Sequence, residues 1–261
     1  MSVSWPIHMN DIPEIFKEAR EYRDLPHALE DAQSTFNESA IYAGIATLAR
    51  QWHTQYRRPA RILDLCAATG WTAKAVAQAI PVEYAALVDT DARALEIARA
   101  NLVPSCAVEC WVQDAVDITP PSRFDLICMN SAYHHIEPSR KVDFLRNAHG
   151  LLDLDGEILM GEHFLPSYPA SEYRRSVIDF YSLLLTELRK RREPVNAVGV
   201  IRRSALYSWE GLYEYKVAYK IFLTHLARAR LQCAATQKVW PQQEGLLPPD
   251  CGSFVLRLLR C

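Results

Sequence analysis

The chain has 261 residues, of which 49% are hydrophobic and 23% are charged, and its formal net charge is −2. This composition excludes a mainly disordered chain, and the lack of net positive charge disfavours a nucleic-acid-binding protein. The seven cysteines form no CxxC pair, which favours reduced thiols in a cytoplasmic protein over disulfides or a metal site. Neither a signal peptide nor a membrane-spanning segment is expected.

The first 60 residues are predicted to form an N-terminal helical cap. Asp11 to Glu14 (DIPE) combines a capping residue, an early proline and an acid, which is typical of a helix start. A second helix is expected to begin near Asn37 or Ser39. Its apolar residues share one helix face: Ile41, Ile45 and Leu48.

Residues 61–170 are predicted to form an α/β core, because short apolar runs alternate with helical segments. The expected strands are 61–65, 84–88, 107–112, 124–129 and 157–160. The expected helices are 71–79, 91–102 and 139–152. Strands that alternate with helices indicate βαβ units and a Rossmann-like, doubly wound parallel sheet.

The remaining residues depart from this alternation. Residues 171–231 are predicted to form a helical lid, with one long helix at 171–191 and a second from about 208 to 228. Residues 232–261 are expected to close the core as a β-hairpin of two strands, 233–240 and 253–259. The expected fold is a seven-stranded α/β sheet with N-terminal helices and a helical lid insertion before the last two strands.

The turn after the first predicted strand has the composition of a ligand-binding loop. Residues 64–70 read DLCAATG, and small side chains there let the backbone approach a ligand. The next two strands end in acids, Asp89 followed by Thr90 and Asp114 followed by Ala115. Ligands of open α/β sheets bind at these strand ends, where an acid can accept hydrogen bonds from both ribose hydroxyls.

This series of motifs resembles that of the class I S-adenosylmethionine-dependent methyltransferases, in which an acid is followed by GxGxG. Asp64 matches the acid and Gly70 the last glycine, whereas Cys66 and Ala68 replace the other two glycines. Further matches follow in family order between about residues 61 and 162. They are the helix ARALEIARANL, the segments FDLI and NSAYHHI, and the turn LLDLDGE.

The resemblance implies that S-adenosyl-L-methionine is the cofactor and that a methyl group is transferred. It implies that Asp114 bonds the adenine amino group, that Ala115 reaches the ring through its backbone, and that Tyr42 contacts the methionine end. For Asp64, capping of the following helix is the alternative, and for Tyr42 it is core packing. The candidate cofactor-binding residues are Tyr42, Asp64, Cys66, Ala68, Gly70, Asp89, Thr90, Asp114, Ala115 and Asn130.

Three histidines follow the fourth and fifth predicted strands and are candidate catalytic residues. A base is needed only if the acceptor carries a proton that must leave, and histidine titrates near neutral pH. The candidates are His134, His135 and His163, each with a packing or binding role as the alternative. Aromatic and arginine side chains in the predicted lid suit a small-molecule acceptor with an oxygen, nitrogen or sulfur nucleophile, in specialised metabolism.

Three other functions stay open. Cys66 and Ala68 leave room for transfer of the aminocarboxypropyl group instead of methyl. A non-catalytic binding protein is disfavoured by the retained acids, and an NAD-dependent enzyme by the substituted glycines, which would crowd a pyrophosphate. Residues 130–133 read NSAY and lack the Pro-Pro pair of base methylases, so neither nucleic acid nor membrane is expected as a partner, and a homodimer is left open.

Overall fold

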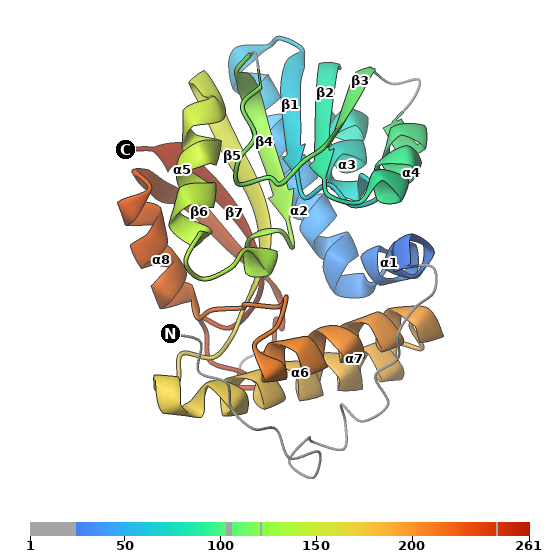
Figure 1. The fold of residues 1–261 in the computed structure, drawn as a ribbon, viewed down its shortest axis with the longest axis vertical. Helices are drawn as coiled ribbons and strands as arrows, with labels where there is room; N and C mark the ends of the chain where they lie inside the picture. The colour runs from blue at the N-terminus through green and yellow to red at the C-terminus, as the bar shows by residue number, and fades with distance from the viewer. Residues whose placement is uncertain (1–24, 103–105, 121, 244) are drawn as a thin grey trace.

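The computed structural model describes residues 25–102, 106–120, 122–243 and 245–261, so the helix start expected at residues 11–14 lies outside the described residues. A seven-stranded sheet with the order β3-β2-β1-β4-β5-β7-β6 forms its centre (Figure 1). The strands are β1 (Ala60–Leu65), β2 (Val82–Asp89), β3 (Ala107–Val112), β4 (Phe124–Asn130), β5 (Leu152–Phe164), β6 (Leu231–Trp240) and β7 (Gly252–Arg260). The first five are parallel, and β7 runs antiparallel to both β5 and β6. The predicted doubly wound sheet and its closing hairpin are confirmed.

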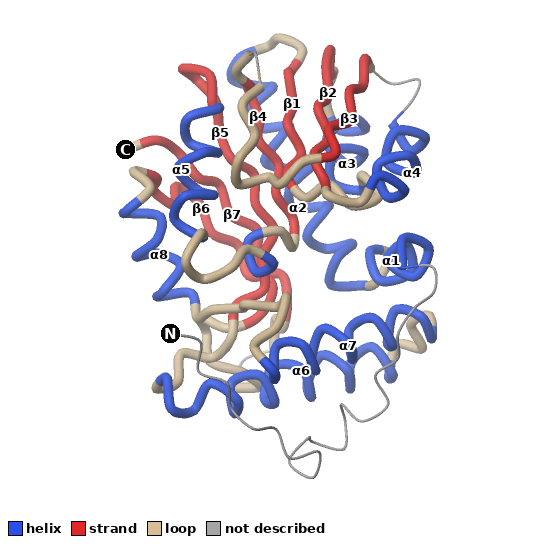
Figure 2. Tube along the Cα trace, in the orientation of Figure 1, coloured by secondary structure: helices blue, strands red, loops and turns tan. Residues whose placement is uncertain are grey.

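Helices cover both faces of this sheet (Figure 2). On one face lie α2 (Phe36–Tyr56), α3 (Trp71–Ala79) and α4 (Ala92–Leu102), and on the other lie α5 (Lys141–Leu151) and α8 (Tyr219–Arg228). Successive strand residues point to opposite faces, so Ile62 joins the first core and Leu63 the second. Burial on both faces explains why the central strands read as continuous apolar runs.

A separate helical layer lies beyond the carboxyl ends of the parallel strands. Here α6 (Tyr173–Lys190) and α7 (Val195–Glu210) pack against each other, and α1 (Leu25–Gln33) packs on α7 (Figure 1). Phe180, Leu184 and Ala205 belong to the buried apolar cluster of this layer. Asn196 also donates a hydrogen bond to Asp31 at 2.9 Å, which ties α7 to α1.

The prediction of a second long helix from about 208 to 228 is wrong. Residues 195–210 and 219–228 are separate helices, α7 and α8, and residues 211–218 are not helical. Gly211 adopts a φ of 70° and ends α7, a conformation that glycine takes without strain. The apolar residues between 212 and 226 have the spacing of a single helix face, which led to the wrong prediction. In the structure α8 packs against β6 and α5 rather than against α7.

The fifth strand is longer than the predicted 157–160. It extends from Leu152 to Phe164 because Leu152 pairs with Phe124 of β4 at one end and β7 continues to pair at the other, with Glu162 opposite Phe254 and His163 opposite Ser253. Glu162 and His163 therefore lie within the strand instead of in a following loop. None of the helices in the described ranges is both long enough and apolar enough to cross a membrane.

Candidate active site

A cavity of about 690 Å³ lies between the strand ends and the α1, α6 and α7 layer. It is formed by the turns after β1, β2, β3 and β4, as expected for an open α/β sheet. Ten of the thirteen candidate residues line it. They are Cys66, Ala68, Asp89, Thr90, Asp114, Ala115, Asn130, His134, His135 and His163.

The other three candidates are not on the cavity wall. Asp64 is buried and accepts a hydrogen bond from the backbone N–H of Ala73 at 3.1 Å, so it caps α3. Burial raises the pKa of Asp64 to about 7. The ring of Tyr42 stacks on Trp71 with 6.0 Å between ring centroids. Gly70 lies at the start of α3, where an added Cβ would approach Ala98 Cβ to 2.8 Å.

The turn after β1 holds two side chains in a conformation that favours glycine. Cys66 has a φ of 56° and Ala68 a φ of 45°, both in the left-handed region. These are the positions at which the family motif has glycine, so the backbone of the motif is retained. The backbone N–H of Ala68 donates to Asp89 Oδ2 at 2.8 Å, which joins the turns after β1 and β2.

Replacing Ala68 with glycine is expected to stabilise the protein. An L-residue in the left-handed region costs about 1–3 kcal/mol, and the extra flexibility of glycine in the unfolded chain offsets about 0.5–1 kcal/mol. The net gain of about 1 kcal/mol should raise Tm by roughly 2–4 °C in thermal unfolding. Ala67→Gly is the matched control, because Ala67 is buried without a positive φ and should destabilise when truncated. A Tm that falls equally in both variants would contradict this prediction.

One end of the cavity presents carboxylates. Asp89 at the end of β2 also accepts a hydrogen bond from the backbone N–H of Asp91 at 3.0 Å through Oδ1. Asp114 after β3 pairs with the Arg140 guanidinium at 2.7 Å and accepts from the backbone N–H of Val116. Each carboxylate oxygen has a second lone pair, so both acids can accept further hydrogen bonds from a ligand.

A buried network connects α2 to the middle of the cavity. Glu38 accepts from Asn130 Nδ2 at 2.9 Å and lies 2.8 Å from His163 Nε2. A side chain at Gly161 would collide with Ile41 and Asn130, so glycine in β5 allows α2 to pack close enough to place Glu38 there. Asn130 Oδ1 is buried without a hydrogen-bond partner in the described part of the chain.

His134 lies on a short 3₁₀ helix, Tyr133–His135, directly after β4. Its Nδ1 atom lies 2.5 Å from Glu162 Oε1, and its backbone N–H donates to Glu162 Oε2 at 3.2 Å. Burial, reinforced by the charge of Lys216, holds the pKa of His134 well below its usual range. With Nδ1–H donated to Glu162, the neutral ring turns its Nε2 lone pair toward Glu214.

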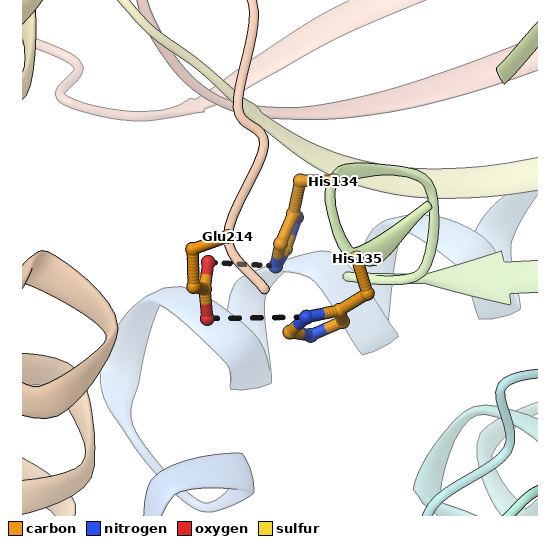
Figure 3. Close-up of side chains that lie close together, drawn as sticks. All are labelled: His134, His135 and Glu214. Carbon is orange, nitrogen blue, oxygen red and sulfur yellow. Dashed lines mark ion pairs between the residues drawn. The ribbon is translucent and has the colours of Figure 1, made fainter. Parts of the chain in front are cut away.

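Glu214 comes from residues 211–218 and closes this end of the cavity (Figure 3). Its Oε2 atom lies 3.5 Å from His134 Nε2, and its Oε1 atom lies 4.0 Å from His135 Nδ1. Burial alone would raise the pKa of Glu214, but Lys216 at 2.5 Å outweighs burial, so the pKa lies below its usual range. His135 is half exposed and lies 3.1 Å from the carbonyl oxygen of Tyr213.

Five charged residues on the cavity wall were missed from the sequence: Glu38, Glu137, Arg140, Glu214 and Lys216. Glu38 stands in the first turn of α2, where an acid is ordinarily explained by the helix dipole. Glu214 and Lys216 fell inside the incorrectly predicted helix from about 208 to 228. Glu162 follows the predicted fifth strand, and the structure pairs it with His134.

The cavity wall fits the polar groups of S-adenosylmethionine. Asp89 and Asp114 offer carboxylate acceptors of the kind that hydroxyl and amino groups of a ligand require, and the small side chains of the Cys66–Ala68 turn line the same cavity. Asn130, at the end of β4, lines the same cavity. The cofactor would therefore lie along the ends of β1 to β4.

Comparisons with known proteins agree with this reading. Residues 62–156 match the family model of a methyltransferase domain. No curated protein sequence matches the chain.

Several solved structures share the fold. Mitomycin 7-O-methyltransferase MmcR aligns with a TM-score of 0.55 and 16% identity over 91% of this chain and 60% of its own. A methyltransferase from Clostridium acetobutylicum aligns with a TM-score of 0.54 and 10% identity, over 83% of this chain and 91% of its own. LepI in complex with S-adenosylmethionine aligns with a TM-score of 0.54 and 13% identity, over 82% of this chain and 46% of its own. This chain thus spans 60% of the mitomycin enzyme's length. The chain thus carries a methyltransferase-domain match over residues 62–156 and shares its fold with solved S-adenosylmethionine-dependent methyltransferases.

Proposed function

We propose that this protein transfers the methyl group of S-adenosylmethionine to a small-molecule acceptor. The observation that carries this proposal is one continuous cavity whose wall includes Asp89 and Asp114 at one end and His134, His135 and Glu214 at the other. The first end matches the polar groups of the cofactor, and the second offers polar side chains to an acceptor. The sulfonium of bound S-adenosylmethionine supplies an activated methyl group, so the chain has to position the acceptor and exclude water.

We place the nucleophilic atom of the acceptor next to His134 and His135. Of the three candidate histidines, His163 has both ring nitrogens within hydrogen-bond distance of protein partners, Ser253 Oγ at 2.8 Å and Glu38 Oε1 at 2.8 Å. His163 therefore positions α2 and β5. His134 keeps Nε2 for the cavity, because Glu162 occupies its Nδ1. This reduces the candidates at the acceptor from three to two.

The acceptor is proposed to be enclosed by a helical lid, which we assign within residues 171–231 to α6 and α7. Apolar and aromatic side chains of these helices line the cavity opposite the strand ends: Phe180, Tyr181, Leu184, Val200 and Ile201. Such a wall suits a largely apolar metabolite that carries an oxygen, nitrogen or sulfur nucleophile. We assign such an acceptor to specialised metabolism. Seven free cysteines fit a cytoplasmic enzyme.

Calorimetry and product analysis test the proposal together. Titration of the protein with S-adenosylmethionine, S-adenosylhomocysteine and NAD should show binding of the first two only. Incubation of S-adenosylmethionine with a panel of phenols, amines and thiols should then release S-adenosylhomocysteine. Tight NAD binding without S-adenosylhomocysteine binding would contradict the proposal. Release of methylthioadenosine would indicate transfer of the aminocarboxypropyl group instead of methyl.

The assignment of the acceptor end is tested with His134→Ala. Turnover should fall by about 100-fold or more, because the side chain that faces the acceptor is lost, while affinity for S-adenosylhomocysteine stays within about twofold. His149→Ala on α5 is the matched control, since His149 does not line the cavity. Equal turnover in the two variants would place the acceptor elsewhere.

A further inference from the structure

We propose that His134, His135 and Glu214 bind a divalent transition-metal ion at the acceptor end of the cavity. Two imidazoles and one carboxylate form the ligand set that zinc and non-haem iron sites use when positions are left open for substrate. One ligand atom from each of the three residues lies within 4.8 Å of the other two (Figure 3). The three side chains converge from two segments that are about 80 residues apart in the sequence.

The distances leave space for an ion between the ligand atoms. His134 Nε2 and Glu214 Oε2 are 3.5 Å apart, and His135 Nδ1 and Glu214 Oε1 are 4.0 Å apart. Zinc bonds nitrogen and carboxylate oxygen at about 2.0–2.2 Å, so bound ligand atoms lie about 3.3 Å from each other. Since the three ligand atoms lie up to 4.8 Å apart, they would have to approach one another by up to about 1.5 Å, and His135 Nδ1 would turn from the Tyr213 carbonyl oxygen, 3.1 Å away, to the ion.

The surroundings of His134 are those of a metal-binding histidine. Metal-bound imidazoles almost always donate their second ring N–H to a carboxylate or carbonyl, which fixes the ring and its tautomer. Glu162 takes that role at 2.5 Å and also accepts the His134 backbone N–H. The Nε2 lone pair of the neutral ring then faces Glu214, whose Oε2 atom already pairs with the Lys216 ammonium. An ion shared by His134 Nε2 and Glu214 Oε1 would satisfy the remaining lone pairs of both groups.

The segment that carries Glu214 is held at this distance by its own contacts. The backbone N–H of Tyr215 donates to the carbonyl oxygen of His134 at 2.6 Å, which fixes residues 211–218 against the 3₁₀ helix. Lys216 Nζ lies 2.5 Å from Glu214 Oε2. This ammonium would repel an ion bound on its side, so the ion is assigned to the Oε1 side of Glu214, next to His135. Lys216 then anchors the opposite oxygen of the same carboxylate.

The ion would give the acceptor end a specific role, and this part of the inference rests on the proposed methyl transfer. Three protein ligands leave positions open to the cavity, where a hydroxyl oxygen of the acceptor can bind. A divalent ion lowers the pKa of a bound hydroxyl, whose proton passes to water. The oxygen anion then forms the new C–O bond as the C–S bond breaks and its electron pair goes to sulfur. The acceptor is thus expected to carry a hydroxyl group.

Metal binding is measured on the full chain after chelator treatment, without S-adenosylmethionine, so that it is independent of methyl transfer. Calorimetric titration with Zn²⁺ should show one equivalent per chain. His135→Ala, which changes a half-exposed side chain, should weaken this binding at least tenfold. His149→Ala on α5 should leave it unchanged. No binding, or equal binding by wild type and His135→Ala, would overturn the proposal, whatever the outcome for S-adenosylhomocysteine.

A second measurement separates this site from the cysteines, one of which, Cys66, lines the same cavity. Co²⁺ bound by nitrogen and oxygen ligands shows only weak visible bands, whereas thiolate ligands add intense charge-transfer bands near the ultraviolet. The expected spectrum lacks the thiolate bands and is lost in His135→Ala. A thiolate spectrum that persists in His135→Ala would assign the ion to cysteine and refute the site.

Discussion

Asp89→Ala is expected to weaken the binding of S-adenosylhomocysteine by roughly 10- to 100-fold. Hydrogen bonds to a charged group contribute about 1.5–3 kcal/mol, and each 1.4 kcal/mol is a factor of ten in affinity. Asp89 holds the backbone N–H groups of Ala68 and Asp91, yet both carboxylate oxygens keep a lone pair for ribose hydroxyls. Isothermal calorimetry of the two proteins measures the difference directly.

The control for this prediction is Asp143→Ala on α5. Asp143 is exposed, pairs with Arg146 and does not line the cavity, so its removal changes net charge without touching the site. Affinity should match the wild type. If Asp89→Ala and Asp143→Ala bind S-adenosylhomocysteine equally well, the ribose hydroxyls are held by another residue, and the carboxylate end of the cavity has a different role.

Glu214→Gln is expected to lower the free energy of unfolding by about 3–5 kcal/mol. Both partners of the Glu214–Lys216 ion pair are buried, with 5% and 4% of their side chains exposed. Removing one partner leaves the other charge buried without its counter-ion, which is the costly case for buried pairs. Thermal or denaturant unfolding should show a Tm lower by roughly 10 °C, and Lys216→Met should have a similar effect.

The double variant Glu214→Gln with Lys216→Met distinguishes a stranded charge from lost packing. Because neither charge then remains, we expect it to be more stable than either single variant. The pair Lys190–Glu187, in which Lys190 is exposed, offers the comparison, since Lys190→Met should cost less than about 1 kcal/mol. Additive losses in the double variant would mean that the two side chains contribute separately, and that charge burial does not explain the effect.

The predicted elements that held share a physical cause. In the core, each strand is an apolar run because both faces of the sheet are covered, and each helix shows one apolar face. The acids Asp89 and Asp114 could be located for the same reason, since parallel strands bring their carboxyl ends to one edge. The sequence also placed Cys66 and Ala68 in the turn after the first strand. In the structure both residues have the left-handed backbone conformation that glycine favours.

The errors arose where local pattern and tertiary contact disagree. Residues 208–226 have helix-like apolar spacing, yet Gly211 ends α7 and the buried Glu214–Lys216 pair occupies the break. The extent of β5 depended on its partner β7, which lies about 100 residues later in the chain. The periodicity of apolar residues reflects only neighbours within a few residues of each other. It gives no information about an ion pair or a strand partner formed by a distant segment.

The sequence by itself determined the sheet, the helices on its two faces and the edge at which a cofactor would bind, because these follow from short-range apolar patterns. Only the tertiary structure decided which charges meet in the cavity. Glu162 orients His134, Glu38 contacts His163, and Glu214 reaches the histidine pair. A side chain's chemistry depends on the groups within a few ångströms of it, and those groups come from segments that the linear sequence keeps far apart.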